Sequence, residues 1–132
     1  MTAPATPRPT ESELAILNVL WARGEATVRD VFDALYRADG GYTTALKLLQ
    51  VMHAKGLVER DESQRAHVYR ATISKDSTQR RMLSDLARRL FGGSPGELVL
   101  SALGSDEAPS AEELAQIRSL LDRLESDRHV RR

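Results

Sequence analysis

The sequence predicts a mainly α-helical chain with one small β-hairpin, and three observations support that prediction. Apolar residues recur at helical spacing in three successive runs before Gly56. After Gly56 the pattern changes to two short strand-like runs joined by polar residues. Helical spacing returns at Ser74 and continues almost to the end of the chain. This order of elements is that of a winged helix-turn-helix domain followed by a second, helical domain.

The first two helices are predicted by capping boxes, in which a hydroxyl and a carboxylate three residues later cap each other's backbone amides. Thr10 with Glu13 begins the first helix, and Thr27 with Asp30 begins the second. An apolar stripe follows each box, as expected for a helix that covers a core. The second helix is expected to stop near Ala38, before a glycine pair that breaks helices.

The third helix is expected to begin at Thr43 or Thr44 and to end at Gly56, a residue suited to the left-handed conformation that closes helices. One face holds the apolar residues expected in the core: Ala45, Leu48, Leu49 and Met52. In a helix-turn-helix, the second helix of the pair enters the major groove of DNA. The opposite face offers hydroxyls, an amide and an ammonium group, which suit base edges and phosphates: Thr43, Thr44, Lys47 and Gln50.

Two short strands over residues 57–60 and 67–72 predict a hairpin that forms the wing. Arg60 and Arg65 flank its turn and His67 follows, so a wing lying along the DNA backbone could place cations on phosphates. The two acidic residues that follow Arg60 would be repelled if they faced the same phosphates.

Three further helices are expected in the C-terminal half, starting near Ser74, Ser94 and Ser110. Each is too short to be stable alone, and little chain remains for it to pack against. A second copy of the chain would supply the missing surface, and two-fold dimers are the commonest oligomers. The alternative is a monomer in which these helices fold back on the winged domain. The expected dimer interface consists of Leu83, Leu86, Leu90, Leu98, Leu100, Leu103, Leu114, Ile117, Leu121 and Leu124.

The chain is therefore expected to divide into an arm (1–9), a winged domain (10–73), a helical dimerisation domain (74–126) and a charged tail (127–132). Three prolines predict a mobile arm, in which Arg8 could reach a phosphate or serve only as a solubilising charge. The arm lacks the apolar core of a secretory signal, and no apolar stretch is long enough to span a bilayer. A cytoplasmic location without membrane insertion is expected.

The composition of the 132-residue chain argues against several kinds of site. There is no cysteine, which removes disulfides, thiolate metal sites and a cysteine nucleophile. No nucleophile–base pair or carboxylate pair points to catalysis, so the chain is not expected to be an enzyme. The histidines lack metal-ligand spacing, and no metal or cofactor is expected at His53, His67 or His129.

The charges balance, with 19 basic and 19 acidic residues. Many DNA-binding domains are basic overall, but only cations that lie near phosphates release counterions. The placement of the charges therefore decides between two hypotheses. One is a dimeric repressor that binds duplex DNA, and the other is a winged-helix module that binds protein partners.

Several segments, in this order and at this spacing, resemble the BlaI/MecI/CopY family of bacterial repressors, the penicillinase repressors. The resemblance implies a homodimer that represses transcription from an inverted-repeat operator. It is carried by Pro9–Leu14 with Val19–Trp21, Ala26–Val31, Gly41–Thr44 with Lys55–Val58, Tyr69, Phe91–Gly93 and Leu98–Leu100.

The resemblance also implies ways in which repression is relieved. In the antibiotic-responsive members, a membrane-embedded sensor metalloprotease leads to cleavage of an asparagine–phenylalanine bond just after a Leu-Val-Leu segment. The matching positions here are Ser101 and Ala102, which depart from that pattern. The copper-responsive members carry cysteine pairs near the C-terminus, and the lack of cysteine excludes copper sensing through thiolates here.

Overall fold

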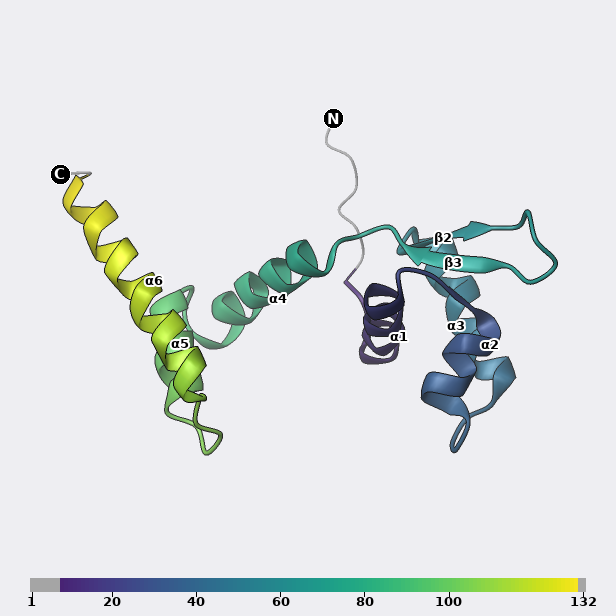
Figure 1. Cartoon of the computed structure of the whole chain (residues 1–132), viewed down its shortest axis with the longest axis horizontal. Helices are drawn as coiled ribbons and strands as arrows, with labels where there is room; N and C mark the ends of the chain where they lie inside the picture. The colour runs from purple at the N-terminus through teal and green to yellow at the C-terminus, as the bar shows by residue number, and fades with distance from the viewer. Residues whose placement is uncertain (1–7, 131–132) are drawn as a thin grey trace. The chain divides into compact units, whose positions relative to one another are not determined.

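The computed structural model describes residues 8–130, and of the expected arm only Arg8 and Pro9 lie within that range. The chain forms two compact units that divide between Arg81 and Met82. The elements (Figure 1) are α1 (Glu11–Arg23), β1 (Ala26–Thr27), α2 (Val28–Val31), the π-helical turn η1 (Phe32–Tyr36), α3 (Tyr42–Lys55), β2 (Val58–Asp61), β3 (Val68–Ala71), α4 (Lys75–Leu90), α5 (Pro95–Leu103) and α6 (Ala111–Val130).

The winged helix-turn-helix fold predicted for the first unit is confirmed, with both capping boxes in place. At the start of α1, Glu13 N donates to the Thr10 hydroxyl over 3.2 Å and Thr10 N donates to the Glu13 carboxylate over 2.9 Å. Thr27 and Asp30 make the same reciprocal pair at the start of α2. The hydrogen bond from the Thr27 amide, together with its hydroxyl and the charge of Arg23, lowers the pKa of Asp30 despite partial burial.

The sheet has three strands rather than the two of the predicted hairpin. β1 pairs with β3, so the strand order is β1-β3-β2, with both pairings antiparallel. Tyr69 in β3 lies opposite Ala26 on one side and Arg60 on the other. β1 is only two residues long and has no alternating pattern of its own, so its pairing depends on where β3 lies.

The second predicted helix is also irregular. After one turn of α2 it widens into η1, and the chain then turns through residues 37–40. The backbone of Gly40 packs against the Tyr36 ring, and a Cβ added at Gly40 would lie 3.0 Å from a ring carbon. A π-helical turn of this kind changes the direction in which the following residues leave a helix. The glycine pair therefore ends this helix as expected from the sequence, whereas the widening into η1 was not predicted.

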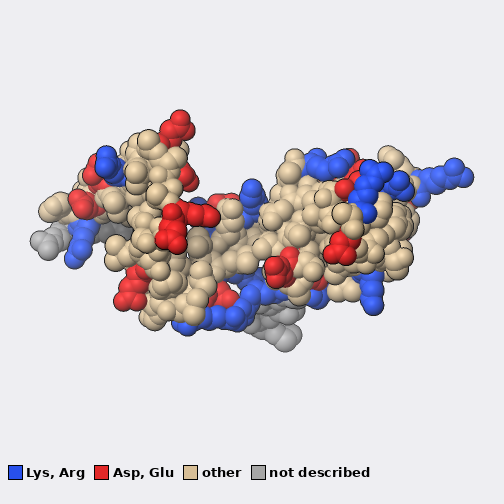
Figure 2. Space-filling model, turned by 90° about the horizontal axis from the view of Figure 1, so that it is seen from below, with Lys and Arg blue, Asp and Glu red and all other residues tan. Residues whose placement is uncertain are grey.

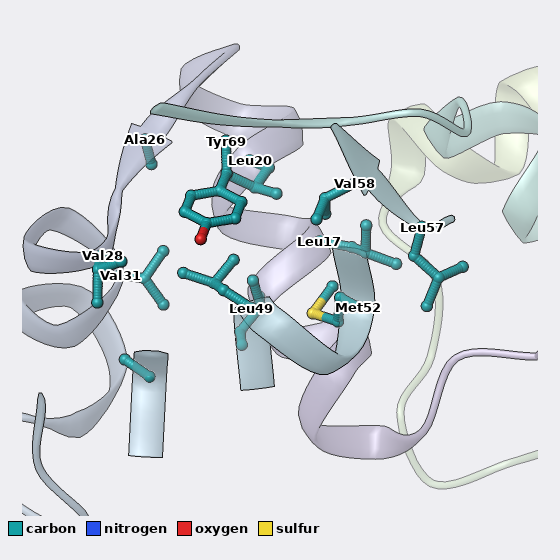
Figure 3. Close-up of a cluster of buried hydrophobic side chains, with 12 residues drawn as sticks. Leu17, Leu20, Ala26, Val28, Val31, Leu49, Met52, Leu57, Val58 and Tyr69 are labelled. Atoms are coloured by element: carbon teal, nitrogen blue, oxygen red, sulfur yellow. The ribbon is translucent and has the colours of Figure 1, made fainter. Parts of the chain in front are cut away.

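The core of the first unit lies between the sheet and its three helices (Figure 3). Tyr69 projects from β3 into this cluster and is 1% exposed. Leu20 from α1, Val31 from α2 and Leu49 from α3 surround it and are equally buried. Each element thus contributes its apolar face to one cluster, which holds α3 in a fixed orientation.

An ion pair joins the far end of α3 to α1. Lys55 Nζ lies 3.0 and 2.9 Å from the two carboxylate oxygens of Glu13, a side chain that is almost fully buried. Burial acts to raise the pKa of Glu13, but the Thr10 and Lys55 hydrogen bonds and the Lys55 charge outweigh it, and the pKa is lowered overall. Trp21 adds a second tie, because its indole N–H donates to the Ile73 carbonyl oxygen over 2.9 Å.

The second unit consists of the end of α4 with α5 and α6. Gly92 and Gly93, both with positive φ, close α4 as expected from their sequence. α6 runs through Val130, so residues 127–130 of the expected charged tail are helical. Arg128 and His129 lie in its last turn, where cations favour the negative end of the helix dipole. Within residues 8–130, no helix has the length and apolar character needed to cross a membrane.

Candidate nucleic-acid interface

The outward face of α3 is polar along its length. Thr43, Lys47 and Gln50 are exposed and follow one another at intervals of four and three residues, which places them on one side of the helix. Thr44 is half-buried at the edge of this face. Lys47 makes no ion pair with any residue in the described range 8–130, so its ammonium group is free to meet an anion.

The inward face of the same helix is apolar, and its burial in the core prevents α3 from rotating about its axis. Ala45, Leu49 and Met52 have no exposed surface. Rotating α3 would expose these three side chains and break the Glu13–Lys55 ion pair at its end. Gly41 precedes the helix with φ at 122°, a conformation that favours glycine, so the helix can begin directly after the turn.

The wing places its three predicted residues differently. Arg65 and His67 are exposed in the loop between β2 and β3, and neither pairs with a residue of the described chain. Arg60 instead lies in β2 opposite Tyr69, with its side chain only 26% exposed and paired with Glu62. Arg65 and His67 are thus available at the wing surface, whereas the Arg60 guanidinium is already engaged within the hairpin.

The balanced charge of the chain conceals an uneven distribution. Residues 8–81 contain twelve basic and ten acidic residues, whereas residues 82–132 contain seven basic and nine acidic ones. Figure 2 shows acidic and basic side chains interspersed over the visible face of the winged unit, with basic ones projecting at the wing end. The excess of positive charge therefore lies on the unit that carries α3 and the wing.

Three side chains that are not among the predicted DNA-contact residues lie beside the start of α3. The Arg29 guanidinium carbon lies 5.5 Å from the centroid of the Phe32 ring. The Phe32 ring in turn lies 6.1 Å, centroid to centroid, from the ring of Tyr42, the first residue of α3. The contact between Arg29 and Phe32 could have been predicted from the sequence, because residues three apart on a helix lie side by side. The contact with Tyr42 could not, because it depends on the turn between the helices.

The predicted dimerisation residues lie on a unit with little buried surface. Among its described residues, Ala87 is the one apolar side chain that is buried. Seven of the predicted interface residues are exposed and three are half-buried; the exposed ones are Leu83, Leu86, Leu90, Leu100, Leu114, Leu121 and Leu124. The half-buried ones are Leu98, Leu103 and Ile117. Ser101 and Ala102 are exposed within α5.

Residues 8–130 contain no cluster of three or more histidine, cysteine or carboxylate side chains that could hold a metal ion. His53 and His67 are exposed in the first unit, and His129 is exposed near the end of α6.

Most of the chain is similar to known proteins. The penicillinase-repressor family model matches residues 9–123. The transcriptional regulator BlaI of Mycobacterium tuberculosis is 35% identical over 102 residues, which cover 73% of this chain and 74% of that protein. An uncharacterized 16.5 kDa protein of Latilactobacillus sakei is 26% identical over 113 residues, covering 85% and 77%. Among solved structures, the reduced form of MarR from Escherichia coli aligns with a TM-score of 0.43 at 19% identity, covering 87% and 76%.

Proposed function

Because the chain belongs to the penicillinase-repressor family of DNA-binding transcriptional repressors, we propose that it acts as a homodimer on a pseudo-palindromic operator. The observation that carries this proposal is the polar face of α3, which is fixed outward by a fully buried apolar face. In this proposal α3 enters the major groove, as the second helix of a helix-turn-helix does.

The side chains on α3 divide into two roles. Thr43, Thr44 and Gln50 offer hydroxyl, methyl and amide groups that can contact base edges, whereas Lys47 suits a phosphate or a guanine. In the wing, Arg65 and His67 contact phosphates and thereby set the register of the protein on the duplex. The Arg60 guanidinium contacts a phosphate only if its ion pair with Glu62 breaks first.

The homodimer is supported by the second unit. Its leucines are exposed in the single chain, and a soluble chain rarely leaves so many large apolar side chains in contact with water. Burying Leu86, Leu90, Leu121 and Leu124 against the same residues of a second copy would supply the missing core. Two copies also present two α3 helices to the two halves of an inverted repeat.

We propose that the signal which relieves repression acts at α5. By the resemblance, Ser101 and Ala102 match the positions of the family's scissile bond, although they differ from its asparagine and phenylalanine, and both are exposed. The bond lies inside a helix, so a protease has to unwind α5 locally before cutting it. The test is the intact mass of the chain recovered from cells before and after derepression. A fragment ending at Ser101 supports cleavage here, and an unchanged mass in derepressed cells contradicts it.

The DNA-binding proposal is tested by footprinting the region upstream of the protein's own operon and then titrating that duplex at several salt concentrations. A protein that makes several phosphate contacts loses roughly a thousandfold or more in affinity between about 50 and 200 mM salt. The zero net charge is the observation that favours the other candidate, a winged-helix module for protein partners. Weak binding that does not respond to salt would support that candidate and contradict DNA recognition.

A further inference from the structure

A row of three side chains joins the first turn of α2 to the first turn of α3. It consists of Arg29, Phe32 and Tyr42, and we refer to it as the aromatic bridge. Phe32 packs partly against the core, while Arg29 lies over its ring and Tyr42 contacts it from α3. The bridge therefore connects the two helices of the helix-turn-helix at the ends from which both begin.

The two ends of the bridge are open to solvent although its middle is anchored. The Arg29 side chain is 65% exposed and Tyr42 is 46% exposed. Arg29 pairs with Asp33 through Nε at 3.6 Å, and its two terminal nitrogens make no ion pair with any other residue among 8–130. A guanidinium group and a phenol, both largely or partly exposed, thus lie on either side of the half-buried Phe32 ring.

The position of these groups fits the DNA backbone rather than the bases. In a helix-turn-helix the first helix crosses the backbone while the second enters the groove, and Arg29 lies in the first turn of that first helix. Tyr42 directly precedes Thr43, the first of the residues assigned to the groove. Arginine and tyrosine are common phosphate ligands, and the arginine fork matches the geometry of phosphate oxygens.

We propose that Arg29 and Tyr42 contact phosphates at the edge of the groove that α3 enters, and that Phe32 holds both in place. This inference rests on the proposed DNA-binding function and extends it to residues outside the predicted interface. Asp33 moderates the contact, because its carboxylate competes with phosphate for the Arg29 guanidinium. Preorganisation by the Phe32 ring reduces the conformational freedom that Arg29 loses on binding.

The experiment uses the full chain and two duplexes of equal length, the footprinted operator and a scrambled sequence. Affinities are measured by fluorescence anisotropy over a range of salt concentrations. We expect Arg29→Ala to weaken binding to both duplexes by a similar factor, roughly tenfold, and to reduce the salt slope by about one. Tyr42→Phe keeps the ring against Phe32 but removes the hydroxyl, and it is expected to weaken binding roughly fivefold.

Asp33→Asn supplies a readout that a purely structural role of Arg29 would not produce. It is expected to strengthen binding in the wild-type background and to have a much smaller effect when Arg29→Ala is already present. Arg23→Ala is the matched control, because it also removes one arginine charge. Arg23 lies at the end of α1 and pairs with Asp30, the neighbour of Arg29 in α2. The control is expected to leave the salt slope unchanged, and thermal unfolding checks that every variant is folded.

The outcomes separate the inference from the function on which it rests. If the wild-type chain binds the operator and Arg29→Ala and Tyr42→Phe behave like Arg23→Ala, the aromatic bridge has no role in phosphate contact and the inference is overturned alone. If Arg29→Ala weakens binding to the operator but not to the scrambled duplex, Arg29 reads bases and the phosphate assignment is overturned. If the wild-type chain binds neither duplex, the proposed function and the inference both fall.

Discussion

Lys55 at the end of α3 holds the carboxylate of Glu13 at the start of α1, with its Nζ within 3.0 Å of both oxygens. Glu13 is 1% exposed, whereas the Lys55 side chain remains one-third exposed. The pair therefore joins a buried acceptor to a donor that approaches from the surface. It sets the distance between α1 and the helix assigned to the DNA groove.

Replacing Lys55 by alanine is expected to lower the free energy of unfolding by about 2 kcal/mol, because it leaves a buried carboxylate without its cation. Chemical denaturation measures the change. Lys47→Ala on the same helix is the control and is expected to stay within about 0.5 kcal/mol of wild type, since Lys47 is exposed and pairs with no described residue. Equal effects of the two substitutions would show that the Glu13 pair does not stabilise the fold.

The same pair predicts how stability changes in acid. The pKa of Glu13 is lowered in the folded chain from an ordinary value of 4.5. A group of this kind stabilises the fold above its unfolded pKa, and that stabilisation is lost as the pH falls through the lower folded pKa. Glu13→Gln is therefore expected to reduce stability at neutral pH and to flatten the loss of stability below about pH 4.5. Unfolding free energies measured from pH 7 to pH 3 test this, and parallel curves for the two chains would contradict it.

The two arginines of the wing are expected to behave differently when each is replaced by alanine. Arg65→Ala removes an exposed cation and is expected to weaken DNA binding and reduce its salt slope by about one, with little change in stability. Arg60→Ala removes a half-buried side chain opposite Tyr69 and is expected to lower the thermal unfolding midpoint. A reversed pattern would mean that Arg60, rather than Arg65, is the cation that meets the backbone.

The dimer is tested by placing a charge in the exposed leucine face of α6. Wild-type protein is expected to sediment at twice the chain mass of 14.6 kDa. Leu121→Asp is expected to shift it toward the monomer, because burying an uncompensated carboxylate at an apolar interface is unfavourable. Arg118→Asp, on the same helix outside the predicted interface, is the control. Sedimentation of the wild-type chain as a monomer at micromolar concentration would contradict the dimer proposal.

Features that depend on neighbouring residues could be predicted from the sequence. The capping boxes at Thr10 and Thr27 form as expected because hydroxyl and carboxylate lie within one helical turn of each other. The buried face of α3 follows from helical spacing for the same reason. The DNA-contact and dimer residues named from the sequence remain predictions, although the exposure of Lys47, Arg65 and Leu121 is compatible with them.

Features that depend on distant segments could not be predicted in this way. β1 exists because Ala26 and Thr27 lie beside Tyr69 and Val68, more than forty residues later in the chain. The strand register places Arg60 opposite Tyr69, which could not be seen without the pairing, although its ion-pair partner Glu62 lies only two residues away in the sequence. The contact between Phe32 and Tyr42 likewise depends on the irregular turn after η1. These tertiary relationships decide which of several exposed-looking cations is available to a ligand.

DNA recognition by α3 and the wing is tested most directly by the affinity of the Lys47→Ala/Arg65→Ala double variant for the footprinted operator, measured beside wild type over a range of salt concentrations. If α3 and the wing form the DNA interface, the double variant binds at least a hundredfold more weakly, roughly tenfold for each cation removed, with a salt slope smaller by about two. Wild-type affinity and slope in a folded double variant would show that α3 and the wing do not form the DNA interface.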